Sequence, residues 1–401
     1  MCGNKGPPTL VPPKWSGHFH KRADRPEGRP RGHNEQRGKD KPTMKFGQFE
    51  LVRWHQDVTP EDSIRRAMEK IELGDEIGMD EIWLAEHHFS RHGLVSGIFS
   101  LLGNVAARTK NARIGTAIVV LPFRNPIQVA EEAATVDILS GGRLTLGVGA
   151  GYQRMEFEAY GLDIGEARAK FREYLAVIKQ AWKPDPLTFK GEFVDVQDVN
   201  VLPKPLQEGG IPIHIAVSTS PESVDFAASQ NMPIIVGGPT ATMGQVPEVL
   251  RLWHERMEHY GNPHEYIDLA VAVNVYVAPT QEQAESDIAG LEDVIEKDFA
   301  RVGNPRTADG KTPDDYKHWE HRDRDRSVAS QRARDAGILP LIGTPEVVIE
   351  RIEILRSLGI NSIRCAFGAA GLDQGKMLDS MRMFREEVMP HFAEESVVAV
   401  S

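Results

Sequence analysis

The amino-acid sequence predicts an α/β protein built as a (β/α)8 TIM barrel with insertions. Predicted strands and helices alternate along the chain from Met44 onward. Short connections between such elements are typical of repeated βα units with parallel strands, and eight units is the number that closes a barrel. An open doubly wound sheet is the alternative. It is less favoured because no early strand leads into a complete dinucleotide-binding glycine fingerprint.

Eight short apolar runs are the predicted strands, and the third is rich in β-branched residues, which suit a pleated backbone. The eight runs are Lys45–Leu51, Glu81–Ala85, Arg113–Leu121, Leu144–Val148, Pro212–Val217, Ile234–Val236, Leu269–Val277 and Ser362–Phe367. Strands of a parallel barrel are buried on both faces, and so their sequences are apolar without strict alternation.

The first predicted helix, Pro60–Glu76, is amphipathic, with Thr59 as its N-cap and proline at its first position. Both residues favour a helix start there. The other predicted helices are Gly97–Arg108, Pro126–Leu139, Ala167–Trp182, Pro221–Ser229, Val246–Tyr260, Gln281–Phe299, Glu346–Leu358 and Met377–Val388.

Two segments interrupt the alternation of strands and helices. Residues Leu187–Val201 are predicted to form a hairpin before the fifth strand. The connection Arg301–Gly343, between the seventh and eighth strands, is longer than a compact domain normally contains. At the mouth of a barrel, this long loop is expected to lie over the active site as a mobile lid; a solvated loop is the alternative.

Composition and charge exclude several classes of protein. The chain is 40% hydrophobic and 26% charged, which is ordinary for a soluble domain, and its longest apolar runs are too short to cross a bilayer. Its only cysteines are Cys2 and Cys365, so we expect no disulfide framework and a cytoplasmic location. The formal net charge of −11 argues against nucleic acid as the main partner.

The charge is unevenly distributed between the N-terminal residues and the rest. Residues 1–43 carry ten Lys or Arg against four Asp or Glu, a net +6, so the remainder carries −17 within the total of −11. This segment is rich in proline and glycine and has no apolar periodicity. We expect it to be a disordered extension, or to precede a true start at Met44. The barrel is predicted to occupy residues 44–392, and residues 393–401 form a C-terminal tail.

The second strand ends in the most informative motif, because Ile82–Ala85 leads directly into Glu86, His87 and His88. The carboxyl ends of barrel strands hold the active site. Adjacent residues of a strand point to opposite faces, so one imidazole faces the mouth while the other packs sideways. We expect His87 to be the inward, catalytic one. No further ligands accompany the pair, and no metal site is predicted.

Two other strand ends have the character of a binding site. The fourth strand continues into Gly149, Ala150, Gly151 and Tyr152, where missing side chains allow a flat group to approach the backbone. The fifth continues into Ser218–Ser220, directly before a helix. Hydroxyl groups and free N–H groups at a helix N-terminus suit a phosphate, although Ser220 is equally suited to N-capping.

The ordered set of motifs resembles the bacterial luciferase-like flavin-dependent monooxygenases, and most closely the luciferase alpha-subunit branch. The resemblance spans roughly residues 44–392. It is carried by Met44–Gly47, Trp83–Phe89, Gly115–Pro122, Gly142–Leu144, Gly147–Tyr152, Glu156–Phe157, Gly343–Glu346 and Phe384–Pro390.

The resemblance implies an enzyme that uses externally supplied reduced FMN and O2. It would oxygenate an apolar organic substrate (an aldehyde, ketone, alkane or terpenoid) through a flavin C4a-peroxide. His87 matches a catalytic group beside the flavin, and Ala117–Ile118 matches a non-prolyl cis peptide under its ring system. Ser218, Thr219 and Ser220 would hold the FMN phosphate. A separate NAD(P)H:flavin reductase would supply the reduced flavin, and relatives are commonly homodimers.

This chain departs from luciferase in the loop after the fourth strand. The reactive cysteine of luciferase is replaced by Gly149, and its phosphate-binding arginine is replaced by Ala150. The nearest basic residue that could take the place of that arginine is Arg154. The change argues against light emission. Other members of the barrel family use coenzyme F420 for hydride transfer, which is the alternative function; a non-catalytic flavin-binding protein is a third. Residues Phe46, Phe89 and Phe367 are expected to be cavity walls or ordinary core residues.

Overall fold

The computed structural model describes residues 44–237, 245–262, 270–291, 303, 305–306, 310–319, 328, 331, 339–368 and 371–393. The predicted N-terminal extension lies outside these residues, as does the C-terminal tail after residue 393. The corresponding domain boundaries therefore stay predictions.

Eight parallel strands form a closed barrel, which confirms the predicted fold. Each strand pairs with the next around the ring, and β12 returns to pair with β1. Gly47 of β1, for example, lies between Glu81 of β2 and Arg364 of β12. The barrel strands are β1 (Lys45–Glu50), β2 (Glu81–Leu84), β3 (Arg113–Thr116), β5 (Leu144–Gly149), β8 (Ile213–Ala216), β9 (Ile234–Gly237), β10 (Ala270–Val277) and β12 (Ser362–Phe367).

The third predicted strand, Arg113–Leu121, is divided into two parts. Strand β3 ends at Thr116, and β4 (Val119–Val120) resumes the pairing with β5. Between them the Ala117–Ile118 peptide bond is cis, as the family resemblance implied. The break therefore lies at the carboxyl end of the strand, at the mouth of the barrel.

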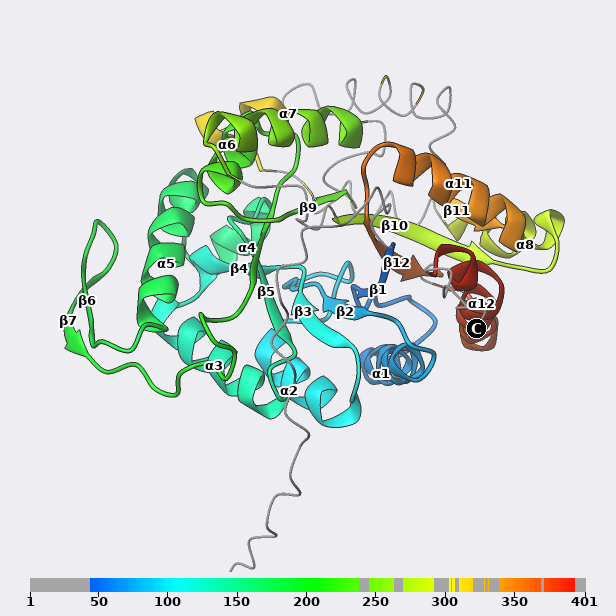
Figure 1. Ribbon diagram of the computed structural model, residues 1–401, viewed down its shortest axis with the longest axis horizontal. Helices are drawn as coiled ribbons and strands as arrows, with labels where there is room; N and C mark the ends of the chain where they lie inside the picture. The colour runs from blue at the N-terminus through cyan, green and yellow to red at the C-terminus, as the bar shows by residue number, and fades with distance from the viewer. Residues whose placement is uncertain are drawn as a thin grey trace, which may run out of the picture. The chain divides into compact units, whose positions relative to one another are not determined.

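Helices surround the strands, as Figure 1 shows for α1, α2, α3 and α5. The hydroxyl of Thr59 accepts a hydrogen bond from the backbone N–H of Asp62 at 3.0 Å, which confirms the predicted start of α1. The helices are α1 (Pro60–Glu76), α2 (Ile98–Arg108), α3 (Pro126–Leu139), α4 (Arg154–Ala159), α5 (Ala167–Ala181), α6 (Pro221–Ser229), α7 (Val246–His259), α8 (Gln281–Ile288), α11 (Pro345–Ser357) and α12 (Gln374–Met383).

The two predicted insertions differ in how much of them the structure describes. Strands β6 (Leu187–Lys190) and β7 (Asp195–Val199) form the expected antiparallel hairpin, which extends beyond α5 in Figure 1. Much of Arg301–Gly343 lies outside the described residues. The predicted helix Gln281–Phe299 is interrupted in the structure, because α8 ends at Ile288 and Gly290 has a φ of 78° that a helix does not continue through; the positions beyond residue 291 lie outside the described residues. Within the connection Arg301–Gly343 the structure adds a short 3₁₀ helix, η5 (Asp314–Trp319), and strand β11 (Leu341–Gly343), which pairs with β10. Neither element was predicted from the sequence.

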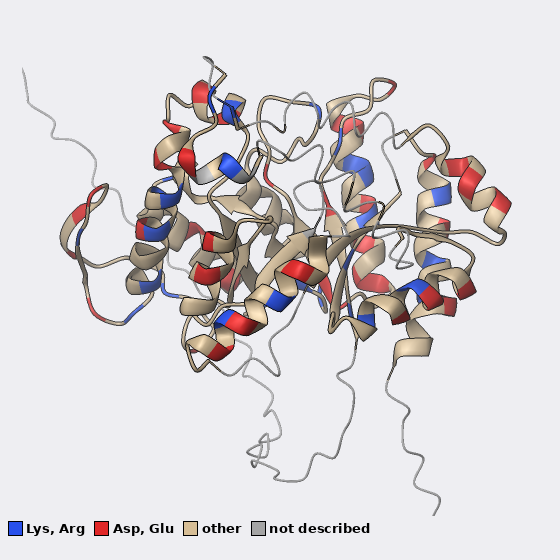
Figure 2. Cartoon of the chain, turned by 90° about the horizontal axis from the view of Figure 1, so that it is seen from above, with Lys and Arg blue, Asp and Glu red and all other residues tan. Residues whose placement is uncertain are grey.

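Charged side chains cover the outer helices with both signs interspersed, while the strands carry few of them (Figure 2). None of the helices in the described part of the chain is long and apolar enough to span a membrane.

A fully buried arginine fills the barrel below its mouth. The guanidinium carbon of Arg364 lies 3.5 Å from the ring centroid of Trp83, and Nη2 donates to Nδ1 of His214 at 3.1 Å. These residues come from β12, β2 and β8, which are not neighbours in the ring, so they meet in the barrel interior. Burial, and then the charge of Arg364, hold the pKa of His214 well below its usual value. Neutral His214 can therefore accept the guanidinium hydrogen bond.

Candidate active site

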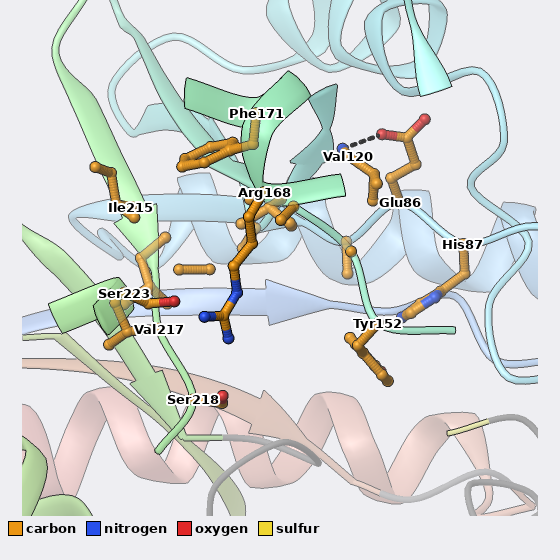
Figure 3. A pocket seen from close by; sticks show the side chains of 18 of the residues that line it. Glu86, His87, Val120, Tyr152, Arg168, Phe171, Ile215, Val217, Ser218 and Ser223 are labelled. Carbon is orange, nitrogen blue, oxygen red and sulfur yellow. Dashed lines mark hydrogen bonds between the residues drawn. The ribbon is translucent and has the colours of Figure 1, made fainter. Parts of the chain in front are cut away.

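One cavity lies at the carboxyl ends of the strands and gathers most of the predicted site residues. It is lined from β1, β2, the β3–β4 break, β5 and β8, and from α5 and η5. Figure 3 shows His87 and Tyr152 on one side of this cavity and Ser218 and Ser223 on the other. The side chain of Arg168 extends between them.

The two adjacent imidazoles point in different directions, as the strand geometry predicted. His87 lines the cavity, with a side chain 11% exposed. His88 is buried away from it, where Nε2 lies 3.1 Å from Oε1 of Glu86 and Nδ1 lies 2.9 Å from the hydroxyl of Tyr160. His87 is thus the imidazole available to a ligand in the cavity.

The Glu86 carboxylate is bonded to groups other than His87. It accepts hydrogen bonds from the guanidinium of Arg124, at 2.5 Å, and from the backbone N–H of Val120, at 2.9 Å. Glu86 therefore joins the strand end to the segment after the cis bond. The carboxylate close to His87 belongs instead to Glu156 of α4, at 3.4 Å from Nδ1. Beside it, Gln153 places Nε2 at 3.1 Å from the same nitrogen.

The β5 loop and the β3–β4 break form one continuous wall of the cavity. Ala117, Ile118, Gly149, Ala150, Gly151 and Tyr152 all line it. A Cβ atom at Gly149 would meet the terminal carbon of Ile118, so a larger residue here would displace the flexible end of that side chain into the cavity wall. The structure thus brings together all the residues predicted for these two segments.

Of the three predicted phosphate residues, only Ser218 lines the cavity. Ser220 is buried and is the N-cap of α6, where its hydroxyl accepts from the backbone N–H of Ser223 at 3.3 Å. This is the N-capping alternative stated above. Thr219 is half-buried and is not among the lining residues. The phosphate role of Thr219 and Ser220 therefore stays a prediction, without support from the cavity geometry.

The cations of the cavity come from α5, and the sequence reasoning missed them. Arg168 and Arg172 line it together with Ser218 and Ser223, and Figure 3 shows the Arg168 guanidinium directed into the cavity. Arg154, the substitute suggested by the sequence, pairs with Glu158 at 2.9 Å and is not a lining residue. Residues four apart share one helix face, so the sequence pairs Arg168 with Arg172, but it does not show which face of α5 meets the cavity.

Of the three phenylalanines expected to be cavity walls or ordinary core residues, Phe46 and Phe367 belong to the hydrophobic core. Phe89 is 58% exposed, and none of the three lines this cavity. The aromatic lining residues are instead Phe49, Phe171, Phe226, Tyr152, Tyr316 and Trp319.

Two of these aromatics belong to η5 in the long β10–β11 connection. The hydroxyl of Tyr316 donates to the carbonyl of Gly151 at 2.7 Å. Trp319 stacks on Tyr152, with ring centroids 5.4 Å apart and planes at 21°. Part of the predicted lid segment thus contacts the β5 loop directly at the cavity.

The cavity offers an apolar body, cationic and hydroxyl groups on one side, and one imidazole on the other. That donor set fits a planar ligand with a phosphate tail, such as FMN. Within the described residues, no group of three or more His, Cys, Asp or Glu is placed to hold a metal ion. Cys365 is buried, and burial raises the pKa of its thiol, which makes it a poor nucleophile.

The fold and the site define a TIM-barrel protein with its ligand cavity at the carboxyl ends of the strands, the usual location of active sites in this architecture. The chain belongs to the luciferase-like monooxygenase family, whose model matches residues 44–362.

Two relatives illustrate the breadth of this family. The alkanal monooxygenase alpha chain of Photorhabdus luminescens is 25% identical over 357 residues, covering 88% of this chain and 98% of that protein. The oxygenase component of the flavin-dependent trigonelline monooxygenase of Acinetobacter baylyi is 30% identical over 245 residues, covering 60% and 67%.

Solved structures share the fold at lower sequence identity. A monooxygenase from Streptomyces bottropensis has a TM-score of 0.74 and 24% identity, covering 87% of this chain and all of that one. The FMN complex of the oxygenating constituent of 3,6-diketocamphane monooxygenase from Pseudomonas putida has a TM-score of 0.71 and 20% identity, covering 87% and 98%. An F420-dependent secondary alcohol dehydrogenase has a TM-score of 0.64 and 18% identity, covering 88% and all of that chain.

Proposed function

We propose that the protein is the oxygenase component of a two-component system, using reduced FMN and O2 to oxygenate an apolar organic substrate. A separate flavin reductase would supply the reduced FMN. The observation that carries the proposal is the division of one cavity into a side with arginine and serine and a side with His87. The names of the relatives support flavin as the cofactor.

We infer that Arg168, Ser218 and Ser223 bind the FMN phosphate. A guanidinium and hydroxyl groups supply charge-assisted and neutral hydrogen bonds to phosphate oxygens. The side chain of Arg168 is 12% exposed, so its charge acts in a partly desolvated environment. Its ion pair with Glu222 is long, at 3.7 Å, and the carboxylate is 66% exposed, so this pair opposes phosphate binding only weakly.

The flat part of the flavin would lie along the wall formed by Ala117, Ile118 and Gly149. Gly149 has no side chain and Ala117 has only a methyl group, which allows close contact between a ring system and the backbone at these two positions. Reduced FMN, when bound there, supplies the electrons that activate O2. His87, beside the same wall, can hold or move a proton because each ring nitrogen of an imidazole can either donate or accept a hydrogen bond.

The aromatic residues of η5 would exclude water from the reacting groups. Tyr316 and Trp319 are 4% and 8% exposed and lie against the β5 loop. A dry cavity protects a reactive oxygenated state from unproductive breakdown. Its apolar walls would select an aldehyde, ketone, alkane or terpenoid. The proposal also includes that the protein forms a homodimer and is located in the cytoplasm.

Rapid mixing tests this function directly. Anaerobic protein with chemically reduced FMN is exposed to O2, and flavin absorbance is followed with and without candidate aldehydes and ketones. We expect reoxidation to be slower than for free FMN and to depend on substrate, with label from 18O2 found in the product. His87→Ala should bring the rate towards that of free flavin. The matched control is His259→Ala, which changes an exposed histidine at the end of α7.

Reoxidation at the rate of free FMN, whatever the substrate, would overturn the proposal. Tight binding of coenzyme F420 with oxygen-independent oxidation of an alcohol would instead establish the hydride-transfer alternative. Binding of flavin without turnover of either kind would indicate the non-catalytic class.

A further inference from the structure

One ring nitrogen of His87 faces two groups with opposite hydrogen-bonding character. Its Nδ1 lies 3.1 Å from Nε2 of Gln153, an amide donor, and 3.4 Å from Oε1 of Glu156, a carboxylate acceptor. Both partners come from the segment at the start of α4. A ring nitrogen either accepts a hydrogen bond or donates one, so Nδ1 can satisfy only one partner at a time.

The geometry favours Gln153 as the partner of the neutral ring. Its contact has the length of an ordinary hydrogen bond, whereas the contact with Glu156 is long. Oε1 of Glu156 already accepts a stronger hydrogen bond from the backbone N–H of His88, at 2.8 Å. Gln153 and Glu156 are 0% and 2% exposed, so water competes little for either side chain.

We propose that Gln153 is a positioning residue that holds neutral His87 as the tautomer with its proton on Nε2. Glu156 then becomes the acceptor for Nδ1–H when the ring takes up a second proton. Each protonation state of His87 therefore has a hydrogen-bond partner at Nδ1 without any movement of the backbone. The use of the Nε2 proton on bound oxygen or substrate rests on the proposed function; the tautomer itself does not.

The surroundings of the ring keep it in one place and add little competing charge. His92 packs edge-on against His87, with ring centroids 4.8 Å apart. Burial, then the charges of His87 and Arg53, lower the pKa of His92 to about 2, so His92 stays neutral. A Cβ atom at Gly93 would lie 3.0 Å from Cβ of His87, so the glycine leaves room for the ring. Glu156 is then the carboxylate in contact with this imidazole.

Nitrogen NMR tests the tautomer without any cofactor. Protein carrying 15N-labelled histidine is studied at a pH where His87 is neutral, and long-range proton–nitrogen correlations show which ring nitrogen is protonated. His87→Ala assigns the signal. We expect the Nε2–H tautomer in the unsubstituted protein. Gln153→Leu should change the tautomer ratio about tenfold towards Nδ1–H, the effect of losing one ordinary hydrogen bond. Gln153→Glu, which replaces the donor by an acceptor, should change it further in the same direction.

Two results would overturn the inference. One is an Nδ1–H tautomer in the unsubstituted protein, which would make Glu156 or an inverted Gln153 amide the acceptor. The other is an unchanged tautomer ratio in Gln153→Leu while the His214 signal shows that the barrel is intact. Gln128→Leu is the matched control, because Gln128 is exposed on α3 and its side-chain amide donates to Glu132 of the same helix. Since no flavin is present, failure of the proposed oxygenation would leave this result standing.

Discussion

Replacing Arg168 by methionine should weaken the binding of FMN and leave the binding of riboflavin unchanged. The two flavins differ only in the phosphate, so this comparison isolates the contact that we assign to the guanidinium. A hydrogen bond to a charged group contributes about 1.5–3 kcal/mol. That loss corresponds to roughly a 10- to 150-fold increase in the Kd of FMN.

The structure supports a value in this range rather than the smaller effect of a surface charge. Arg168 is 12% exposed and lies over the ring of Tyr316, with its guanidinium carbon 5.6 Å from the ring centroid. The ion pair with Glu222 is worth little, because that carboxylate is 66% exposed and the separation is 3.7 Å. Methionine retains most of the apolar contact, so packing changes should be minor.

Flavin fluorescence provides the assay, with both flavins titrated against the unsubstituted protein and against Arg168→Met. The control variant is Arg154→Met, whose arginine pairs with Glu158 and does not line the cavity. Equal weakening of FMN and riboflavin would mean that Arg168 shapes the cavity without contacting phosphate. No change for either flavin would refute the assignment of the phosphate side altogether.

Three further substitutions test the framework around the site. Asp75 accepts hydrogen bonds from the backbone N–H groups of residues 110–112, and Asp75→Asn should lower the free energy of unfolding by about 2 kcal/mol in urea titrations at pH 7. Burial alone would raise the pKa of Asp75, but these hydrogen bonds hold it below its usual value. Ionised Asp75 therefore stabilises the folded protein fully at pH values above the pKa of an unfolded-state aspartate, about 3.9. This contribution is lost as the pH falls through the lower pKa that Asp75 has in the folded protein. The difference in the free energy of unfolding between the unsubstituted protein and Asp75→Asn should accordingly become smaller at low pH. A difference that does not change with pH would contradict the account based on the Asp75 charge. Gly115→Ala should lower the free energy of unfolding by about 1–3 kcal/mol, because the added Cβ would lie 2.5 Å from the rigid ring of Trp83. An unchanged urea midpoint would show instead that the residues of the barrel interior can shift to accommodate the methyl group. Gly149→Ala meets only the flexible end of Ile118, so we expect weaker flavin binding with a nearly unchanged midpoint, and the reverse pattern would contradict this.

Local patterns in the sequence were sufficient to predict the barrel. Each strand is a compact apolar run between clear helix signals, and α1 begins and ends at the predicted residues. The predicted third strand was too long because the break at Ala117–Ile118 has no signature in composition; only the family resemblance pointed to it. Strand β11 was also missed, since it has only three residues within a long connection.

The candidate site was predictable where its residues follow directly from a strand. His87 and the segment Gly149–Tyr152 line the cavity because the chain direction at a strand end leaves little choice of position. Residues on helices were harder to predict. Arg168 is one of several charged residues on α5, and nothing in its neighbours indicates that this one is directed into the cavity.

The sequence by itself determined the order of strands and helices, the closed barrel and the histidine at its mouth. These features depend on hydrophobic periodicity, capping residues and strand alternation, which act over a few neighbouring residues. Only the tertiary structure decided which groups meet there. Gln153 and Glu156 reach His87 across more than sixty positions of the chain. Such contacts depend on how separate elements pack together, and that information is not contained in any local pattern.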